Sequence, residues 1–190
     1  FSFRDFLVTQ ILSKAENWVE NEAEAWQLKD IGLKVDGICP SFMGDIKKYQ
    51  VSFRPGNKVY VSCGKGRQLE YGFPIIELIA SSVPEIEFHL YGDEYHLNQP
   101  QDNIIVHGRI SKEQMNKEIQ KMQAGIRLNK HDGFSEISAK SILWGQYPIT
   151  YLYFPKIDQF AADNVGYVNT IKNMNKLISL LKQIPKKKKP

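Results

Sequence analysis

Hydrophobic and polar positions divide the chain into two parts that differ in periodicity. Over residues 5–31 the apolar side chains recur at helical spacing, and Gly32 is placed where a helix would end. An irregular stretch with several prolines and glycines follows, up to residue 56. This pattern predicts a helical lead-in and a linker over residues 1–56.

From residue 57 onward, short β-branched or aromatic runs alternate with helical patterns. Strands are predicted over residues 58–63, 86–91, 103–106, 125–128, 148–153 and 166–168. Helices are predicted over residues 73–82, 111–122, 135–144 and 170–181. Ser111 and Gln114 have the spacing of a capping box, and Ser135 is placed to cap the following helix. The order indicates an α/β protein with a Rossmann-like, mainly parallel sheet and helices on both faces, over residues 57–184.

Length and composition narrow the class of protein. The 190 residues suit one domain and are too few for an enzyme that needs two complete α/β domains. With 42% hydrophobic and 24% charged residues, the chain resembles globular proteins rather than disordered ones. No apolar run approaches the ~18 residues that span a bilayer, and the first ten residues lack a signal-peptide pattern. We therefore expect a soluble protein of the cytoplasm.

Charge and cysteine content argue against nucleic acid as a partner and against a zinc site. The net charge of +4 comes partly from the basic tail, residues 185–190, so the rest of the domain is close to neutral and nucleic acid is not an expected partner. The lysines of the tail can attract anionic lipid, at about 1 kcal/mol each near a charged surface. Peripheral membrane contact is therefore one interpretation, and a solvated terminus is the other. Cys39 and Cys63 have no partners at metal-ligand spacing, which predicts two reduced thiols and no zinc site.

Three polar turns follow predicted strands, at the edge where Rossmann-like sheets bind ligands. The first turn contains Gly64, Lys65 and Arg67. Glycine lets a ligand approach the backbone, and the two cations suit a phosphate. The turn completes neither of the common glycine-rich nucleotide patterns, so a mobile basic turn is the alternative.

The second turn places Gly108, Arg109 and Ile110 between a strand and a capped helix. Such a turn can hold a planar base against exposed backbone, with Arg109 nearby to contact a phosphate or the base. An ordinary loop between a strand and a helix is the alternative.

The third turn is the most polar and leads into the helix that begins near Ser135. It contributes the candidate residues His131, Asp132, Gly133, Phe134, Ser135 and Glu136. The free amides of residues 133–136 would converge at a helix N-terminus, where the helix dipole favours an anion such as a diphosphate. A hydrogen-bonded pair of His131 and Asp132 within the loop is the alternative. His89, in a strand, and His96, in a polar loop, are expected to be structural or solvated.

The third turn, together with residues 139–149, resembles the signature of retaining glycosyltransferases of the GT-B fold, the group 1 or family 4-like enzymes. Three further glycine motifs match the family in order, at Gly64–Lys65, Tyr91–Gly92 and His107–Gly108. The resemblance covers residues 57–181 and implies the C-terminal, nucleotide-sugar-binding half of such an enzyme. Residues 21–32 resemble the segment that leaves the N-terminal, acceptor-binding domain, which is then missing here.

The resemblance also implies roles for single residues. Asp132 matches the carboxylate that contacts the transferred sugar, and Lys65, with Arg67, would neutralise the charge on the leaving diphosphate. Lys140 stands where a carboxylate holds the ribose, and a lysine cannot accept hydrogen bonds from hydroxyls. Glu136 can replace that contact, or Lys140 can bind a phosphate oxygen. Tyr71 stands where a second basic residue is expected.

The function implied is binding of a UDP or GDP sugar by a retaining, metal-independent, hexosyltransferase-like enzyme. The sequence contains no D-x-D metal motif, so no metal or other cofactor is expected besides the nucleotide sugar substrate. Without the acceptor-binding domain, we expect these residues to bind the donor and not to transfer it. The alternative is a non-catalytic nucleotide-binding or partner-binding module of similar fold. A receiver-like signalling domain is disfavoured because the turn after the first strand is basic.

Overall fold

A six-stranded sheet forms the centre of the molecule in the computed structural model, which describes residues 2–42, 44–129, 132–150, 169–170 and 174–186. The strand order is β5-β4-β3-β6-β7-β8, and every neighbouring pair is parallel. The strands are β3 (Lys58–Ser62), β4 (Glu87–Tyr91), β5 (Ile104–Gly108), β6 (Ala124–Arg127), β7 (Tyr147–Thr150) and β8 (Asn169–Thr170). The predicted α/β, Rossmann-like fold class is confirmed.

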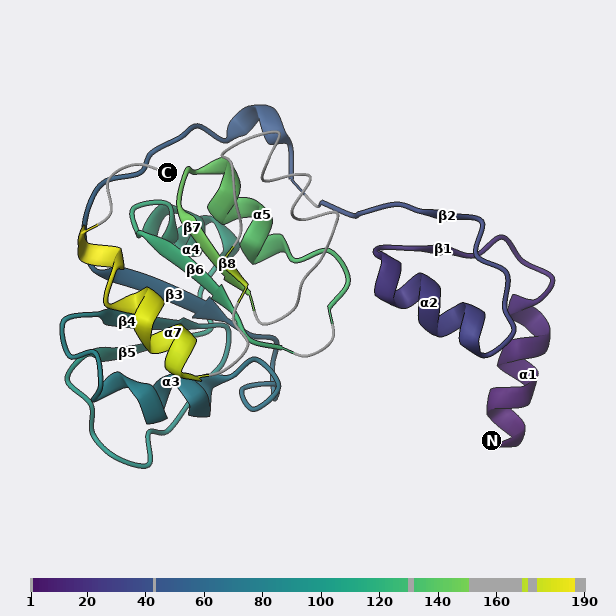
Figure 1. Cartoon of the computed structure of the whole chain (residues 1–190), viewed down its shortest axis with the longest axis horizontal. Helices are drawn as coiled ribbons and strands as arrows, with labels where there is room; N and C mark the ends of the chain where they lie inside the picture. The colour runs from purple at the N-terminus through teal and green to yellow at the C-terminus, as the bar shows by residue number, and fades with distance from the viewer. Residues whose placement is uncertain (1, 43, 130–131, 151–168, 171–173, 187–190) are drawn as a thin grey trace.

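Helices cover both faces of this sheet (Figure 1). They are α3 (Phe73–Ala80), α4 (Lys112–Ile119), α5 (Glu136–Leu143) and α7 (Met174–Leu181), followed by the short 3-10 helix η2 (Ile184–Lys186). Val59 and Val61 of β3 pack with α3 and α7, whereas Tyr60 between them packs with α4 and α5. Successive strand residues point to opposite faces, so a strand buried on both sides reads as a continuous apolar run. No helix among the described residues is long and apolar enough to cross a membrane.

Helix α5 lies closest to the sheet, and seven of its eight residues are buried. Gly125 of β6 makes this approach possible, because a Cβ atom there would lie 2.2 Å from Ser141 Oγ. Tyr60 Oη lies 2.7 Å from the same Oγ atom and donates to Gln146 Oε1 at 3.0 Å. Ser135 caps the helix as predicted, accepting from the Ser138 amide at 3.2 Å. The helix N-terminus is thereby held at the end of β6.

The N-terminal unit contains two helices instead of one. It consists of α1 (Phe3–Leu12), β1 (Trp18–Val19), α2 (Glu22–Asp30) and β2 (Gly37–Ile38), with β1 parallel to β2, and leads through η1 (Ile46–Lys48) to β3. The prediction of one continuous helical pattern over residues 5–31 was therefore wrong, because the helix is interrupted between residues 12 and 22. Asn17 interrupts it, because its side chain donates to the Leu12 and Lys34 carbonyls at 2.8 and 3.0 Å. Asn21 then starts α2 by accepting from the Glu24 amide at 2.9 Å.

Smaller differences affect caps and boundaries. Ser111 accepts from the Gln114 amide at 3.1 Å, but the Gln114 side chain donates to Glu118 at 3.2 Å instead of returning to the cap. Only half of the predicted capping box therefore forms, because the Gln114 side chain extends along the helix towards Glu118 and not back to the Ser111 amide. The predicted strand 166–168 lies outside the described residues, as do residues 151–153 of the predicted strand 148–153. The last helix begins at Met174 rather than at residue 170, which belongs to β8.

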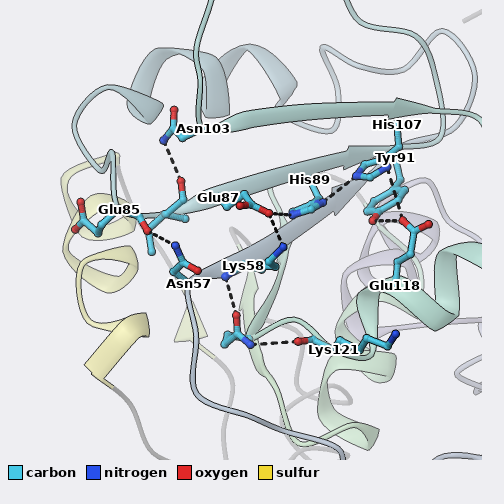
Figure 2. A network of polar contacts seen from close by, with 12 residues as sticks. Asn57, Lys58, Glu85, Glu87, His89, Tyr91, Asn103, His107, Glu118 and Lys121 are labelled. Carbon is cyan, nitrogen blue, oxygen red and sulfur yellow. Dashed lines mark hydrogen bonds and ion pairs between the residues drawn. The ribbon is translucent and has the colours of Figure 1, made fainter.

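A row of polar side chains runs along β4 and β5 on the face covered by α4 (Figure 2). Lys58 Nζ lies 2.7 Å from Glu87 Oε1, and the same oxygen lies 2.7 Å from His89 Nε2. The other ring nitrogen of His89 lies 2.8 Å from His107 Nε2. Since Glu87 is an acceptor, His89 donates to it and accepts from His107, which fixes the neutral tautomer of both rings.

The same row ends near the carboxyl edge of the sheet. His107 stacks on the Tyr91 ring at a centroid distance of 4.2 Å, and Tyr91 Oη donates to Glu118 Oε2 at 2.7 Å. His107 Nδ1 lies 3.7 Å from that same carboxylate oxygen. Burial lowers the pKa of both His89 and His107 below the ordinary value of 6.5, although Glu87 and Glu118 oppose this. Both rings are therefore neutral in the folded protein near pH 7.

We expect the free energy of unfolding to fall as the pH falls from 7.5 to 5.5. A histidine with a lowered pKa in the folded state binds protons more readily when unfolded, so stability rises with pH in this window by at most about 1.4 kcal/mol per pH unit for each ring. Urea unfolding of the chain at several pH values measures the slope, which His89→Gln should flatten. His96→Gln, at an exposed loop position, is the matched control. Equal slopes in all three proteins would contradict the assignment.

Candidate functional site

Two neighbouring clefts open at the carboxyl ends of the strands. The smaller, of about 310 Å³, is lined among others by Gly64, Tyr71, Arg127, Phe134, Glu136 and Lys140. The larger, of about 730 Å³, is lined among others by Lys65, Asp93, His107, Gly108 and Arg109. Because Gly64 and Lys65 are adjacent in the chain, the turn after β3 contributes to both clefts. We call these the inner and the outer cleft.

Glycines at this edge bring the strand ends together. Gly92 follows β4 with φ +106°, and a Cβ atom there would lie 1.9 Å from the Cys63 carbonyl oxygen. Its amide donates to the Gly108 carbonyl at 2.9 Å, and the Cys63 amide donates to the Tyr91 carbonyl at 3.0 Å. Only glycine fits such a position. The glycine motifs singled out in the sequence therefore meet at one edge of the sheet.

Lys140 forms one wall of the inner cleft and is almost fully buried. Its Nζ atom lies 3.0 Å from Glu136 Oε1 and donates to Asn116 Oδ1 at 3.1 Å. Lys112 Nζ lies 3.1 Å from the same Glu136 oxygen. Burial alone would raise the pKa of Glu136, but the two lysines outweigh it and lower that pKa. The group of three carries a net positive charge beside the inner cleft, which Glu136 and Lys140 line.

Arg127, at the end of β6, forms the opposite wall. Its Nε and NH2 atoms donate to the two carboxylate oxygens of Asp132 at 2.6 and 2.7 Å, and both side chains are 12% exposed. The guanidinium also lies 4.1 Å from the centroid of the Tyr71 ring. Burial lowers the pKa of Arg127, but Asp132 more than compensates and raises it. Both oxygens of Asp132 are thus engaged within the protein.

The loop that follows Asp132 contacts the N-terminal unit. Asn21 Nδ2 donates to the carbonyls of Asp132 and Gly133 at 2.7 and 3.1 Å. The Phe134 amide donates to Glu20 Oε2 at 2.9 Å. A carboxylate from the β1–α2 connection thus takes up one of the amides that the sequence assigned to an anionic ligand.

The structure brings seven of the predicted site residues to the two clefts. Gly64, Phe134, Glu136 and Lys140 line the inner cleft, and Lys65, Gly108 and Arg109 line the outer one. The turn after β3 is shared by the two groups, because Gly64 lines one cleft and Lys65 the other.

The other predicted residues lie elsewhere. Arg67 is exposed and pairs with Glu70 at 2.9 Å, so its charge is already compensated. Ile110 packs into the apolar cluster around α4, and Ser135 is fully buried as the cap of α5. Asp132 and Gly133 contact Arg127 and the N-terminal unit, and His131 lies outside the described residues.

Four residues of the site had no assigned role in the sequence analysis: Glu20, Lys112, Asn116 and Arg127. Arg127 stood in the polar third turn, and the uncharged Tyr71 signalled that a cation had to come from elsewhere. Glu20 and Asn116 gave no signal. Their contacts join residues 114 and 24 positions apart in the sequence.

Comparison with solved structures identifies proteins that share this fold. No protein-family model matches the sequence, and no curated protein matches it. A mutant of S. aureus TarM, solved with Fondaparinux, alpha-GlcNAc-glycerol and UDP, has a TM-score of 0.71 at 13% identity, covering 98% of this chain and 40% of TarM. Sucrose-phosphate synthase from Thermosynechococcus elongatus has a TM-score of 0.72 at 13% identity, covering 95% of this chain and 52% of the synthase.

The lipopolysaccharide galactosyltransferase WaaB gives a TM-score of 0.62 at 14% identity, covering 90% of this chain and 53% of WaaB. These structural neighbours are glycosyltransferases of the GT-B fold. The chain therefore has a fold found in that class, and spans about two fifths to one half of the proteins compared. The assignment to the family 4-like group and to its C-terminal domain stays a prediction.

We expect Asp132→Asn to lower the free energy of unfolding by about 2–4 kcal/mol, because it leaves the largely buried Arg127 without its charge partner. Replacing both partners, as Arg127→Met with Asp132→Leu, should restore stability to within about 1 kcal/mol of wild type. Urea unfolding of the three proteins is the measurement. A single mutant as stable as wild type would show that Asp132 does not serve to neutralise Arg127.

Proposed function

We propose that this chain is the donor-binding part of a glycosyltransferase that takes its sugar from a UDP or GDP sugar. The observation that carries the proposal is the pair of clefts joined by the turn at Gly64 and Lys65, at the carboxyl edge of a parallel sheet. This edge is where Rossmann-like folds bind nucleotides. The GT-B fold of the structural neighbours supports transfer of a sugar as the reaction.

The clefts offer a distinct place to each part of such a donor. The base lies in the outer cleft, against the backbone at Gly108 and Arg109. The diphosphate lies at the Gly64–Lys65 turn, where Lys65 and the lysines around Glu136 supply positive charge. Glycine allows the phosphates to approach the backbone. The sugar then lies in the inner cleft, towards Phe134.

Charge in the site favours departure of the nucleotide diphosphate. Bond breakage between the sugar and the diphosphate leaves negative charge on the phosphate oxygens, and fixed cations stabilise that charge. Lys65 and Lys140 are the cations we assign to this task, and with them the proposed reaction needs no metal. Retention of the sugar configuration is part of the proposal only because the resemblance implies it. Glu136 pairs with Lys140 and with Lys112, and it thereby positions these two cations.

The acceptor belongs to a domain that these residues do not contain. The N-terminal unit supports this view, because it exposes apolar side chains that isolated domains normally bury: Phe3, Phe6, Ile11, Trp18 and Trp26. We propose a cytoplasmic enzyme with a nucleotide sugar as its partner and no nucleic acid. Its basic tail can add peripheral contact with an anionic membrane.

A second candidate function is a nucleotide-binding module without catalysis. The Arg127–Asp132 pair favours it, because the carboxylate matched to the sugar contact has both oxygens bound to arginine. Both candidates predict binding of a nucleotide diphosphate. They differ in whether a protein that contains the acceptor-binding domain transfers the sugar.

We expect the chain to bind UDP or GDP with a Kd of about 10 μM to 1 mM, since half of a closed site retains base and phosphate contacts. Lys65→Ala should weaken binding about threefold to tenfold by removing a cation from a phosphate. Arg67→Ala is the matched control, because Glu70 already compensates its charge. Isothermal calorimetry measures all three. Identical affinities for the wild type and Lys65→Ala would show that the first turn does not belong to the binding site.

We further expect no sugar transfer by the 190-residue chain alone, because no acceptor group closes over the donor to orient it and exclude water. Incubation with UDP-glucose and a panel of sugar acceptors, followed by quantification of free UDP, tests this. Turnover above that of a heat-denatured sample would show that the acceptor site lies within these residues.

A further inference from the structure

Glu20 reaches from the N-terminal unit to the loop that borders the inner cleft. Its Oε2 atom accepts from the Phe134 amide at 2.9 Å, and Phe134 itself lines the cleft. Gly133 makes room for it, since a Cβ atom there would lie 1.5 Å from Oε2. The carboxylate therefore lies against the backbone of the loop that contributes Phe134 to the cleft.

Surrounding contacts hold Glu20 in this position. Its own amide donates to Glu24 Oε2 at 2.8 Å, and the Ser41 hydroxyl hydrogen-bonds Oε1. The neighbouring Asn21 donates to the Asp132 and Gly133 carbonyls at 2.7 and 3.1 Å. Two consecutive residues of the connection between β1 and α2, Glu20 and Asn21, are thus hydrogen-bonded to the loop. Glu20 is placed by the fold and is not a freely rotating surface side chain.

The two carboxylates near this loop differ in their charge environment. Asp132 is neutralised by Arg127 through two hydrogen bonds. Glu20 accepts only from an amide and a hydroxyl and makes no ion pair within the described part of the chain. A carboxylate can accept about four hydrogen bonds, and the described residues take up two of these positions on Glu20. Glu20 therefore places a negatively charged acceptor beside the loop that borders the cleft.

We infer that Glu20 is a specificity-determining residue that selects uncharged, hydroxyl-bearing donor sugars over sugars that carry a carboxylate. The inference rests on the proposed function, which places the sugar beside Phe134. Hydroxyl groups donate to the open positions on Glu20, whereas a uronic acid brings a second carboxylate to a partly desolvated edge, where like charges repel. Glu20 takes over the sugar contact that the sequence assigned to Asp132.

The test compares neutral and acidic donors on wild type and Glu20→Gln. The probes are UDP-glucose against UDP-glucuronate and GDP-mannose against GDP-mannuronate, with UDP and GDP as references, all measured by calorimetry. For the pair whose nucleotide binds, we expect wild type to prefer the neutral sugar about tenfold and Glu20→Gln to reduce this preference to within about twofold. Asp30→Asn, an exposed charge at the far end of α2, is the matched control and should keep the wild-type ratio.

A second variant separates position from charge. Gly133→Ala keeps the carboxylate but displaces it from the loop, because the new Cβ atom would occupy its place. It should also reduce the preference, with the unfolding temperature of each variant confirming that it is folded. Binding of UDP or GDP with an unchanged ratio in both variants would overturn the inference and leave the proposed function intact. Failure of both nucleotides to bind would overturn the proposed function and the inference together.

Discussion

The contact between α5 and the sheet at Gly125 fixes the geometry of the candidate site. Because Gly125 has no side chain, Ser141 and Tyr60 meet above it, and Tyr60 also reaches Gln146 at the far end of the helix. Buried hydrogen bonds of this kind are costly to break, so they define a single position for the helix. The position of α5 in turn determines where its residues Glu136 and Lys140 lie. A larger residue at position 125 would move the helix, and with it one wall of the inner cleft.

At this edge of the sheet, the buried charged side chains have charged partners. The nearly buried Lys140 has Glu136 and Asn116, and Arg127, at 12% exposure, has a bidentate partner in Asp132. An isolated charge in such surroundings would cost several kcal/mol, which explains why each is matched. Lys65 lines the outer cleft, is exposed and belongs to neither of these pairs. A ligand phosphate is therefore attracted most strongly by Lys65. It leaves the two buried ion pairs, Lys140–Glu136 and Arg127–Asp132, intact.

The sequence predicted the sheet well because its evidence is local. Alternation of short apolar runs with helices depends on neighbouring residues, and β3, β4, β5 and β6 begin and end within two residues of their predicted bounds. The break between α1 and α2 was missed because Asn17 acts through the carbonyl of Lys34, which no periodicity reveals. Polar turns correctly marked the edge that carries the clefts. Their pairing partners, such as Asn116 for Lys140, lie on other elements and depend on packing.

Hydrogen bonds attach the N-terminal unit to the domain through the loop that borders the candidate site. A two-stranded parallel sheet with one helix is too small to be stable alone, so β1, α2 and β2 depend on what they touch. Among the described residues, Glu20 and Asn21 supply hydrogen bonds between this unit and the loop that follows Asp132. A ligand that engages Glu20 therefore acts on the attachment of the unit as well. By thermodynamic linkage the converse also holds: whatever steadies the N-terminal unit against the loop changes the affinity of the cleft to the same extent.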